Sequence, residues 1–234
     1  MNELQKIAVV IDADNTQLSK IGDTLREIST RGRIVVKRAY GNWRKEALKN
    51  WEPEIKRLAI KAQQQFDYVS GKNATDMALV IDTIELLYTG NYDGFVIVSS
   101  DSDYTPLAIK LRESGVCVLG VGEKKTPESF RNACDEFLYL ENIAAEPEEI
   151  EEAPDAMDEV HALLKKAYEA YLDDDGYVGI ASAGSFLRRT KPDFDTRTYG
   201  FTTLSQLLAA FPQKYEVHKF KKKDTTVVEY KCLF

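Results

Sequence analysis

The stretch Phe95-Val-Ile-Val-Ser-Ser-Asp-Ser-Asp-Tyr-Thr-Pro-Leu-Ala108 joins a short apolar strand to a helix through two aspartates. Its first four residues have strong strand propensity and predict a buried strand. Thr105 followed by Pro106 predicts a helix N-cap with proline at the first helical position. Under that assignment Asp101 and Asp103 have no structural role, although they sit at the mouth of a buried strand.

The same alternation of apolar runs and helix-length segments recurs over the first 142 residues. Because apolar strands separated by amphipathic helices are typical of a sheet covered on both faces, we expect a three-layer, doubly wound, mainly parallel α/β fold. Ligands of such sheets bind outside the carboxyl ends of the strands, where strand order reverses. The expected strands are 7–11, 33–40, 66–69, 95–99, 116–121 and 137–140, and the expected helices are 19–29, 53–64, 75–88 and 106–114.

The composition is that of a globular protein with reduced thiols. Hydrophobic residues make up 44% and charged residues 29% of the 234 residues, so global disorder is not expected. No apolar run approaches the roughly 20 residues that cross a bilayer, and the first residues do not resemble a secretory signal. The chain has three widely spaced cysteines and two histidines. These numbers argue against a disulfide framework, a zinc finger or a histidine-centred catalytic site, and they favour a cytoplasmic location.

The excess negative charge is concentrated in one segment. The net charge is −7, and residues 146–159 hold eight acidic residues and no basic ones. Self-repelling charge and two prolines predict an extended linker. We therefore expect a first domain at 1–145, an acidic linker at 146–155 and a second domain at 156–234.

Three segments of the first domain bring acids to one edge of the predicted sheet. Asp12 ends the first strand, Asp101 follows the fourth, and Asp76 begins the third helix. Close carboxylates raise one another's pKa unless a cation compensates, and ligation by oxygen alone suits Mg²⁺ or Mn²⁺. The competing interpretation is helix capping, which stays open for Asp14 or Asn15 after the first strand and for Asp76 itself.

The segments 10–15, 72–82 and 98–107 resemble the three signatures of NYN domains, PIN-like metal-dependent ribonucleases of the LabA-like group. The resemblance spans about residues 5–142. It implies an endoribonuclease that uses Mg²⁺ or Mn²⁺ and leaves a 5′-phosphate, whereas some NYN domains only bind RNA. Ser100 stands where the family commonly has glycine. The implied catalytic and metal-binding residues are Asp12, Asp76, Asp101 and Asp103, with Asn15, Asp82 and Ser99 supporting them. The helical period nevertheless places Asp82 on a different face of its helix from Asp76.

A basic and aromatic segment after the second strand is a candidate RNA groove. Residues 31–61 contain ten basic and three acidic residues, with Tyr40, Trp43 and Trp51 interleaved. Basic side chains attract the phosphate backbone, and exposed aromatic rings stack on unpaired bases. The alternative is a solvated helix face with the tryptophans in the core. The predicted RNA-binding residues here are Arg38, Tyr40, Asn42, Trp43 and Arg44, and Lys72 is a candidate contact to the scissile phosphate.

The sequence pattern of the second domain predicts a winged helix-turn-helix. An amphipathic helix with Met157, Val160 and Leu164 on one face is followed by helical stretches at 179–187 and 203–210 and by strands at 215–220 and 226–230. The segments 192–201 and 204–208 resemble the LOTUS (OST-HTH) domain, which implies RNA binding or docking of a protein partner. Lys219, Lys221, Lys222 and Lys223 in the hairpin are predicted RNA contacts, although a solvated hairpin tip would have the same composition.

Three functions compete at this stage. The first is a metal-dependent endoribonuclease whose RNA is single-stranded or structured, without a membrane partner and with a homodimer as one possible assembly. The second is a non-catalytic RNA-binding adaptor. The third is a haloacid-dehalogenase-type phosphatase, because residues 12–16 fit the DxDxT pattern. That family usually spaces its later acidic pair more widely than Asp101 and Asp103, and the chain shows no cap insertion after the first strand.

Overall fold

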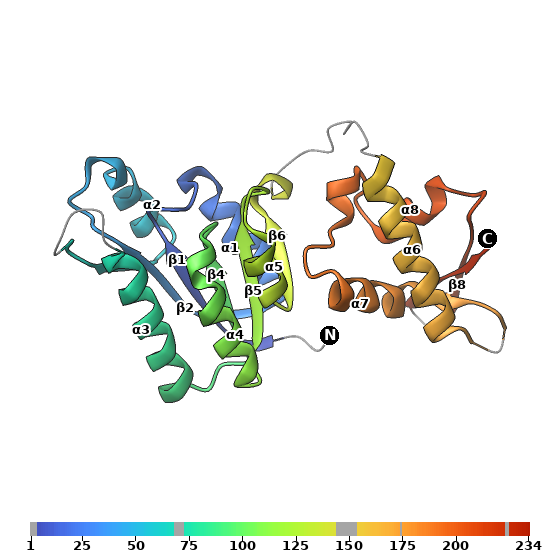
Figure 1. Cartoon of the computed structure of the whole chain (residues 1–234), viewed down its shortest axis with the longest axis horizontal. Coiled ribbons are helices and arrows are strands. Elements are labelled where there is room, and N and C mark those ends of the chain that lie inside the picture. Colours follow the sequence, from blue (N-terminus) through green and yellow to red (C-terminus); the bar gives the residue numbers. More distant parts are fainter. Residues whose placement is uncertain (1–3, 68–72, 144–153, 174, 223–224) are drawn as a thin grey trace. The chain divides into compact units, whose positions relative to one another are not determined.

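The computed structural model describes residues 4–67, 73–143, 154–173, 175–222 and 225–234. The chain divides into two compact units, Met1–Ala144 and Ala145–Phe234 (Figure 1). None of the helices in the described ranges combines the length and the apolar character needed to span a membrane.

The first unit is built on a six-stranded parallel sheet with the order β3-β2-β1-β4-β5-β6. The predicted doubly wound α/β class is confirmed. β1 and β4 are neighbours, with Ile11 opposite Val98, so the two acid-bearing strands finish side by side. The strands are β1 (Leu4–Asp12), β2 (Gly32–Gly41), β3 (Lys61–Gln64), β4 (Gly94–Val98), β5 (Cys117–Gly122) and β6 (Glu136–Tyr139).

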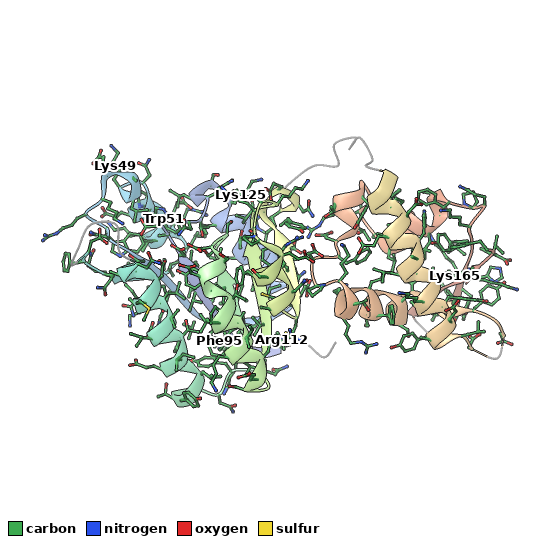
Figure 2. The ribbon with its side chains drawn as sticks, viewed as in Figure 1. Lys49, Trp51, Phe95, Arg112, Lys125 and Lys165 are labelled. Atoms are coloured by element: carbon green, nitrogen blue, oxygen red, sulfur yellow. The ribbon has the colours of Figure 1, made fainter. Side chains whose placement is uncertain are left out.

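Helices cover both faces of this sheet and create two cores (Figure 1). Trp51 belongs to the core under α1 and α2, and Phe95 belongs to the core under α3, α4 and α5 (Figure 2). Alternate residues of β1 serve the two cores, as expected for a strand buried on both faces. The helices are α1 (Ile21–Ser29), α2 (Trp51–Arg57), α3 (Ala74–Thr89), α4 (Thr105–Glu113) and α5 (Glu128–Ala133).

The prediction was wrong between residues 53 and 67, and residues 68–69 of the expected third strand lie outside the described residues. The expected helix 53–64 ends at Arg57, and Ala59 then takes a left-handed conformation with φ of 50°. The third strand is Lys61–Gln64 rather than 66–69, and Phe66 is exposed. β3 is a polar edge strand, so its sequence lacks the apolar run by which the buried strands are recognised.

The second unit is a small helical domain with an antiparallel sheet. Its helices are α6 (Pro154–Tyr171), α7 (Ile180–Thr190) and α8 (Leu204–Ala210), and its strands are β7 (Val178–Gly179), β8 (Tyr215–Lys222) and β9 (Thr225–Cys232), in the order β7-β9-β8. The expected helices and hairpin are present, whereas β7 was not predicted. Because α6 begins at Pro154, the last two residues of the expected linker are helical, and residues 146–153 of that linker lie outside the described ranges.

Gly120 in β5 tests the packing of the second core of the first unit. It pairs with Phe137 in β6, and a Cβ atom at this position would lie 2.4 Å from a ring carbon of Phe137 and 2.8 Å from Sγ of Cys134. We expect Gly120→Ala to lower the free energy of unfolding by about 1–3 kcal/mol, because buried neighbours must move. Gly184→Ala in α7 is the control, since its Cβ would meet nothing closer than 3.7 Å and alanine favours a helix. Calorimetry showing equal effects of the two substitutions would contradict the packing argument.

Candidate functional site

The candidate site lies where the sheet reverses its strand order. After β1 the chain passes to α1 on one face, and after β4 it passes to α4 on the other. The connections therefore diverge at the carboxyl ends of two adjacent strands, and such a divergence leaves a crevice in doubly wound sheets. The predicted acid Asp12 is the last residue of β1, and Asp101 lies in the connection after β4.

Asp12 is fully buried at the end of β1 and is held by four donors. Its Oδ1 accepts the backbone N–H groups of Asp14 (3.1 Å) and Asn15 (3.2 Å). Its Oδ2 accepts Nδ2 of Asn15 (2.9 Å) and the hydroxyl of Ser99 (3.0 Å). Burial raises the pKa of Asp12, the hydrogen bonds from Asn15 and Ser99 oppose that rise, and the charge of Asp76 adds to it. The predicted supporting residues Asn15 and Ser99 thus contact Asp12 directly.

The loop after β4 is folded around Asp101. The backbone N–H of Asp101 donates to the Ser99 hydroxyl (3.1 Å), and Oδ1 of Asp101 accepts the N–H of Asp103 (2.9 Å). Asp101 is therefore the N-cap of the short 3₁₀ turn Ser102–Tyr104. This corrects the expectation that Asp101 has no structural role and that Thr105 is the cap. Thr105 is instead the first residue of α4.

Tyr104 connects the third acidic segment to this loop. Asp76, in the first turn of α3, accepts the hydroxyl of the fully buried Tyr104 at 2.8 Å. Burial, followed by the charges of Asp12 and Asp76, raises the pKa of Tyr104 far above its usual value, so the phenol remains a donor. Asp103 accepts Nδ2 of Asn73, the residue before α3, at 3.0 Å. Tyr104 was not selected from the sequence, where only its hydroxyl group and its position directly after Asp103 point to a role at the site.

Electrostatic repulsion among the predicted acids centres on Asp76, which interacts with Asp12, Asp101 and Asp103. Burial raises the pKa of Asp76, the Tyr104 hydrogen bond opposes this, and the charges of Asp101, Asp103 and Asp14 raise it further. Within the described ranges, no lysine or arginine forms an ion pair with Asp12, Asp76, Asp101 or Asp103. A cluster of this kind is typical of functional sites, because uncompensated negative charge favours the binding of a cation.

The donor chemistry fits a hydrated hard cation rather than an enclosed one. Among the described residues, no three His, Cys, Asp or Glu side chains gather closely enough to hold a metal ion. Mg²⁺, however, usually keeps several waters and binds through one or two carboxylates. Asp76 uses one oxygen for Tyr104, and Asp101 uses one for its cap, whereas Asp12 has both oxygens occupied. Asp76 and Asp101 are therefore the better candidates for direct contact with a cation.

Asp82 belongs to a separate network on α3. It forms an ion pair with Arg38 and accepts a hydrogen bond from the Tyr40 hydroxyl. Burial alone would raise the pKa of Asp82, but the hydrogen bonds from Arg38 and Tyr40 and the Arg38 charge lower it below the usual value. Tyr40 is 1% exposed, so its predicted stacking on RNA is not possible in this structure. The helical-face argument for Asp82 agrees with this position.

The other predicted groove residues form a partly exposed surface beside β3. Nε1 of Trp43 donates to the carbonyl of Gln63 at 3.0 Å, Asn42 donates to Asp67 at 3.1 Å, and Arg44 lies over the ring of Phe66 at 5.0 Å. Trp51 is buried, as the core interpretation required. Lys45, which the sequence analysis did not select, has its Nζ 3.4 Å from Asp14 and 3.5 Å from Asp67.

The predicted lysines differ in how far the structure describes them. Lys219 and Lys221 are exposed on β8, which leaves them available to a partner. Lys72, Lys223 and the side chain of Lys222 lie outside the described residues.

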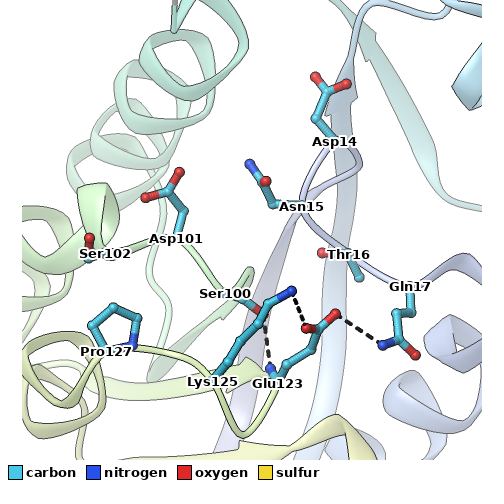
Figure 3. A pocket seen from close by; sticks show the side chains of 10 residues that line it. All are labelled: Asp14, Asn15, Thr16, Gln17, Ser100, Asp101, Ser102, Glu123, Lys125 and Pro127. Atoms are coloured by element: carbon cyan, nitrogen blue, oxygen red, sulfur yellow. Dashed lines mark hydrogen bonds and ion pairs between the residues drawn. The ribbon is translucent and has the colours of Figure 1, made fainter.

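A polar pocket of about 410 Å³ opens beside Asp101 (Figure 3). Glu123, after β5, accepts a hydrogen bond from Gln17 (3.0 Å) and pairs with Lys125 (2.6 Å) on its wall. The hydroxyl of Ser100 accepts the N–H of Glu123 at 2.9 Å, so the serine that departs from the family pattern joins two loops. The sequence analysis missed Glu123 and Lys125 because they follow a strand that carries no acidic motif. The lining residues are Asp14, Asn15, Thr16, Gln17, Ser100, Asp101, Ser102, Glu123, Lys125 and Pro127.

Comparison with protein families matches residues 6–141 to the NYN domain. The chain belongs to the NYN domain family. Residues 151–227 match the OST-HTH/LOTUS domain, so the resemblances of both parts of the chain are confirmed. NYN domains belong to the PIN-like nuclease superfamily, and OST-HTH/LOTUS domains are associated with RNA binding.

Comparisons with individual proteins add the following. No curated protein matches the chain. A solved structure of a protein of unknown function from Vibrio parahaemolyticus is 16% identical, with a TM-score of 0.48, and the match covers 59% of this chain and 94% of that one. A solved structure of an uncharacterized protein from Nitrosomonas europaea is 24% identical, with a TM-score of 0.31, and the match covers 39% of this chain and 83% of that one.

Asp76 and Asp82 on one helix give opposite predictions for stability. Asp76→Asn removes a repelled carboxylate while the amide oxygen can still accept the Tyr104 hydroxyl, so in metal-free buffer at neutral pH we expect Tm to rise by about 1–3 °C. The gain should shrink as the pH falls through the raised pKa of Asp76, because the wild-type carboxyl is then neutral.

Asp82→Asn is the matched control and should lower Tm, because it removes the ion pair with Arg38. The pKa of Asp82 is depressed, so this loss should be full above the unfolded value near 3.8 and should fade as the pH falls through the folded pKa. A thermal-unfolding series against pH in which both variants shift Tm in the same direction would contradict the two electrostatic assignments.

Proposed function

We propose that this protein is a divalent-metal-dependent endoribonuclease whose OST-HTH/LOTUS domain contributes RNA binding. The observation that carries the proposal is that acids from β1, α3 and the loop after β4 lie near enough at the carboxyl edge of the sheet for Asp76 to interact electrostatically with Asp12, Asp101 and Asp103. Membership of the NYN family and the adjoining OST-HTH/LOTUS domain support it.

Asp76 and Asp101 would hold the cation, with Asp103 beside them and Asp12 as the buried anchor. Mg²⁺ or Mn²⁺ bound there would supply Lewis-acid stabilisation of phosphoryl charge and would lower the pKa of a bound water. Asp12 fixes the position of Ser99 and Asn15 through its four hydrogen bonds. Tyr104 fixes one oxygen of Asp76, which directs the other away from the phenol.

The protonation state of the cluster sets the pH at which the site can work. Burial and the neighbouring charges raise the pKa values of both Asp12 and Asp76. A protonated carboxyl is a poor ligand for a hard cation. Cation affinity, and cleavage with it, should therefore increase as the pH rises through the raised pKa of Asp76 and then level off.

A non-catalytic RNA-binding adaptor is the second candidate. The observation in its favour is that, in the described residues, no three potential ligands converge closely enough to hold a metal. The phosphatase alternative loses support, because its nucleophile would be Asp12, which has no exposed surface and has both oxygens hydrogen-bonded.

Asp101→Asn is the decisive variant for catalysis. Asparagine is as good an N-cap as aspartate, so the Ser102–Tyr104 turn should persist while the charge is lost. We expect Mn²⁺-dependent cleavage of labelled single-stranded RNA to fall by about 100-fold or more, because a group that stabilises charge in the transition state is removed. Glu113→Gln, which removes an exposed carboxylate at the far end of α4, is the control and should leave the rate unchanged.

The same assay separates the two candidate functions. Cleavage that needs Mn²⁺ and is lost only in Asp101→Asn supports the nuclease. RNA binding by the wild type with no cleavage in Mn²⁺ or Mg²⁺ supports the adaptor. Equal cleavage by the wild type and Asp101→Asn would refute the role assigned to this residue.

A further inference from the structure

The pocket beside Asp101 is large enough for a ligand but carries the wrong charge for a phosphate. Its volume of about 410 Å³ falls within the range of small-molecule sites. Its walls carry the carboxylates of Asp14, Asp101 and Glu123 against the single ammonium group of Lys125, which is already paired with Glu123 at 2.6 Å. A phosphate would therefore be repelled from the interior, whereas a neutral group that donates hydrogen bonds would be accepted.

The remaining walls suit the base and ribose of a nucleotide. Hydroxyl groups from Thr16, Ser100 and Ser102 line the pocket with the amides of Asn15 and Gln17 (Figure 3). Pro127 adds an apolar surface to these polar side chains. Carboxylate and amide oxygens accept hydrogen bonds from the N–H groups on the base edges and from ribose hydroxyls, and each carboxylate offers about four lone-pair sites.

Glu123 is the acceptor that the pocket holds most firmly. Gln17 donates to its Oε1 at 3.0 Å, and Lys125 contacts its Oε2 at 2.6 Å. Its backbone N–H donates to the Ser100 hydroxyl, so both the main chain and the side chain are fixed. The hydrogen bond from Lys125, followed by the one from Gln17, lowers the pKa of Glu123, which keeps its carboxylate ionised at neutral pH.

We propose that this pocket binds the base and ribose of one unpaired nucleotide of the RNA, next to the phosphodiester presented to Asp101. Asp101 belongs both to the pocket wall and to the acid cluster, which places the two subsites side by side. A base inside the pocket cannot remain paired, and extracting it from a duplex costs a few kcal/mol. The protein therefore selects single-stranded RNA over duplex RNA. This inference rests on the proposed RNA-directed function, but it does not require catalysis.

The test follows the amides of the pocket in the full ¹⁵N-labelled chain, in EDTA so that cleavage plays no part. The probes are a short single-stranded oligoribonucleotide and the same strand annealed to its complement. We expect the single strand to shift the amide signals of residues 100–102 and 123–125, and the duplex to leave them in place. Affinity is taken from these signals, and the OST-HTH/LOTUS domain is the same in the wild type and in every variant, so its contribution cancels when their affinities are compared.

Ser102→Phe fills the pocket without removing a described side-chain hydrogen bond. We expect it to weaken binding of the single strand by about tenfold, the scale of one lost base contact. Ser29→Phe, at the exposed end of α1 on the opposite edge of the sheet, is the control and should bind as the wild type does. If Ser102→Phe does not fold, Gln17→Phe fills the same pocket from the other wall.

The outcomes separate this inference from the proposed function. Duplex RNA that shifts the pocket amides as strongly as the single strand, or a filled pocket with wild-type affinity, overturns the inference. If only the single strand binds in the pocket and Mn²⁺ gives no cleavage, the result supports the inference and refutes the proposed nuclease function. Cleavage that depends on Asp101 while the pocket amides stay unmoved keeps the nuclease and overturns the inference.

Discussion

A carboxylate without exposed surface, Asp12 at the end of the central strand, is the constraint on which the site depends. An ionised carboxylate costs several kcal/mol to bury unless donors replace its water. The donors come from the loop after β1, through Asp14 and Asn15, and from the end of β4, through Ser99. Satisfying one buried charge therefore fixes the two loops that diverge at the reversal of strand order. The Ser99 hydroxyl then accepts the N–H of Asp101, which extends the same constraint to the turn that leads into α4.

The helix α3 shows how the fold treats a charge that it compensates and one that it does not. Asp82 faces β2, where Arg38 and Tyr40 lower its pKa, and the three side chains form a stabilising network. Asp76, six residues earlier, receives one hydrogen bond from a tyrosine, and burial followed by the charges of other acids raises its pKa. A chain selected for stability alone would gain from removing the second charge. Its retention beside Asp101 is the kind of local conflict that functional sites display.

The sequence analysis predicted the layers and the acidic edge because both follow from patterns that are local in the chain. Apolar runs identify buried strands, and parallel strands end at one edge of the sheet. The sequence alone therefore predicts that Asp12 and Asp101 lie at the same edge. It failed at Lys61–Gln64, because an edge strand need not be apolar. It also misjudged Tyr40, whose ring is buried by packing under α3 that no local pattern records. Glu123 and Lys125 escaped notice because their position depends on β5 lying beside β4.

If a cation and RNA bind at this edge as proposed, its electrostatics favour their cooperative binding. RNA carries a negative charge on every phosphate, and the edge presents Asp14, Asp76, Asp101 and Asp103, with Lys45 held nearby by Asp14 and Asp67. A phosphodiester approaches Asp101 more readily when positive charge reduces this repulsion. By linkage, whatever factor a divalent cation contributes to RNA affinity at the first unit, RNA contributes to cation affinity. The nucleotide subsite proposed beside Asp101 agrees with this electrostatic argument, because it would hold the neutral base and ribose and leave the phosphate at the acids.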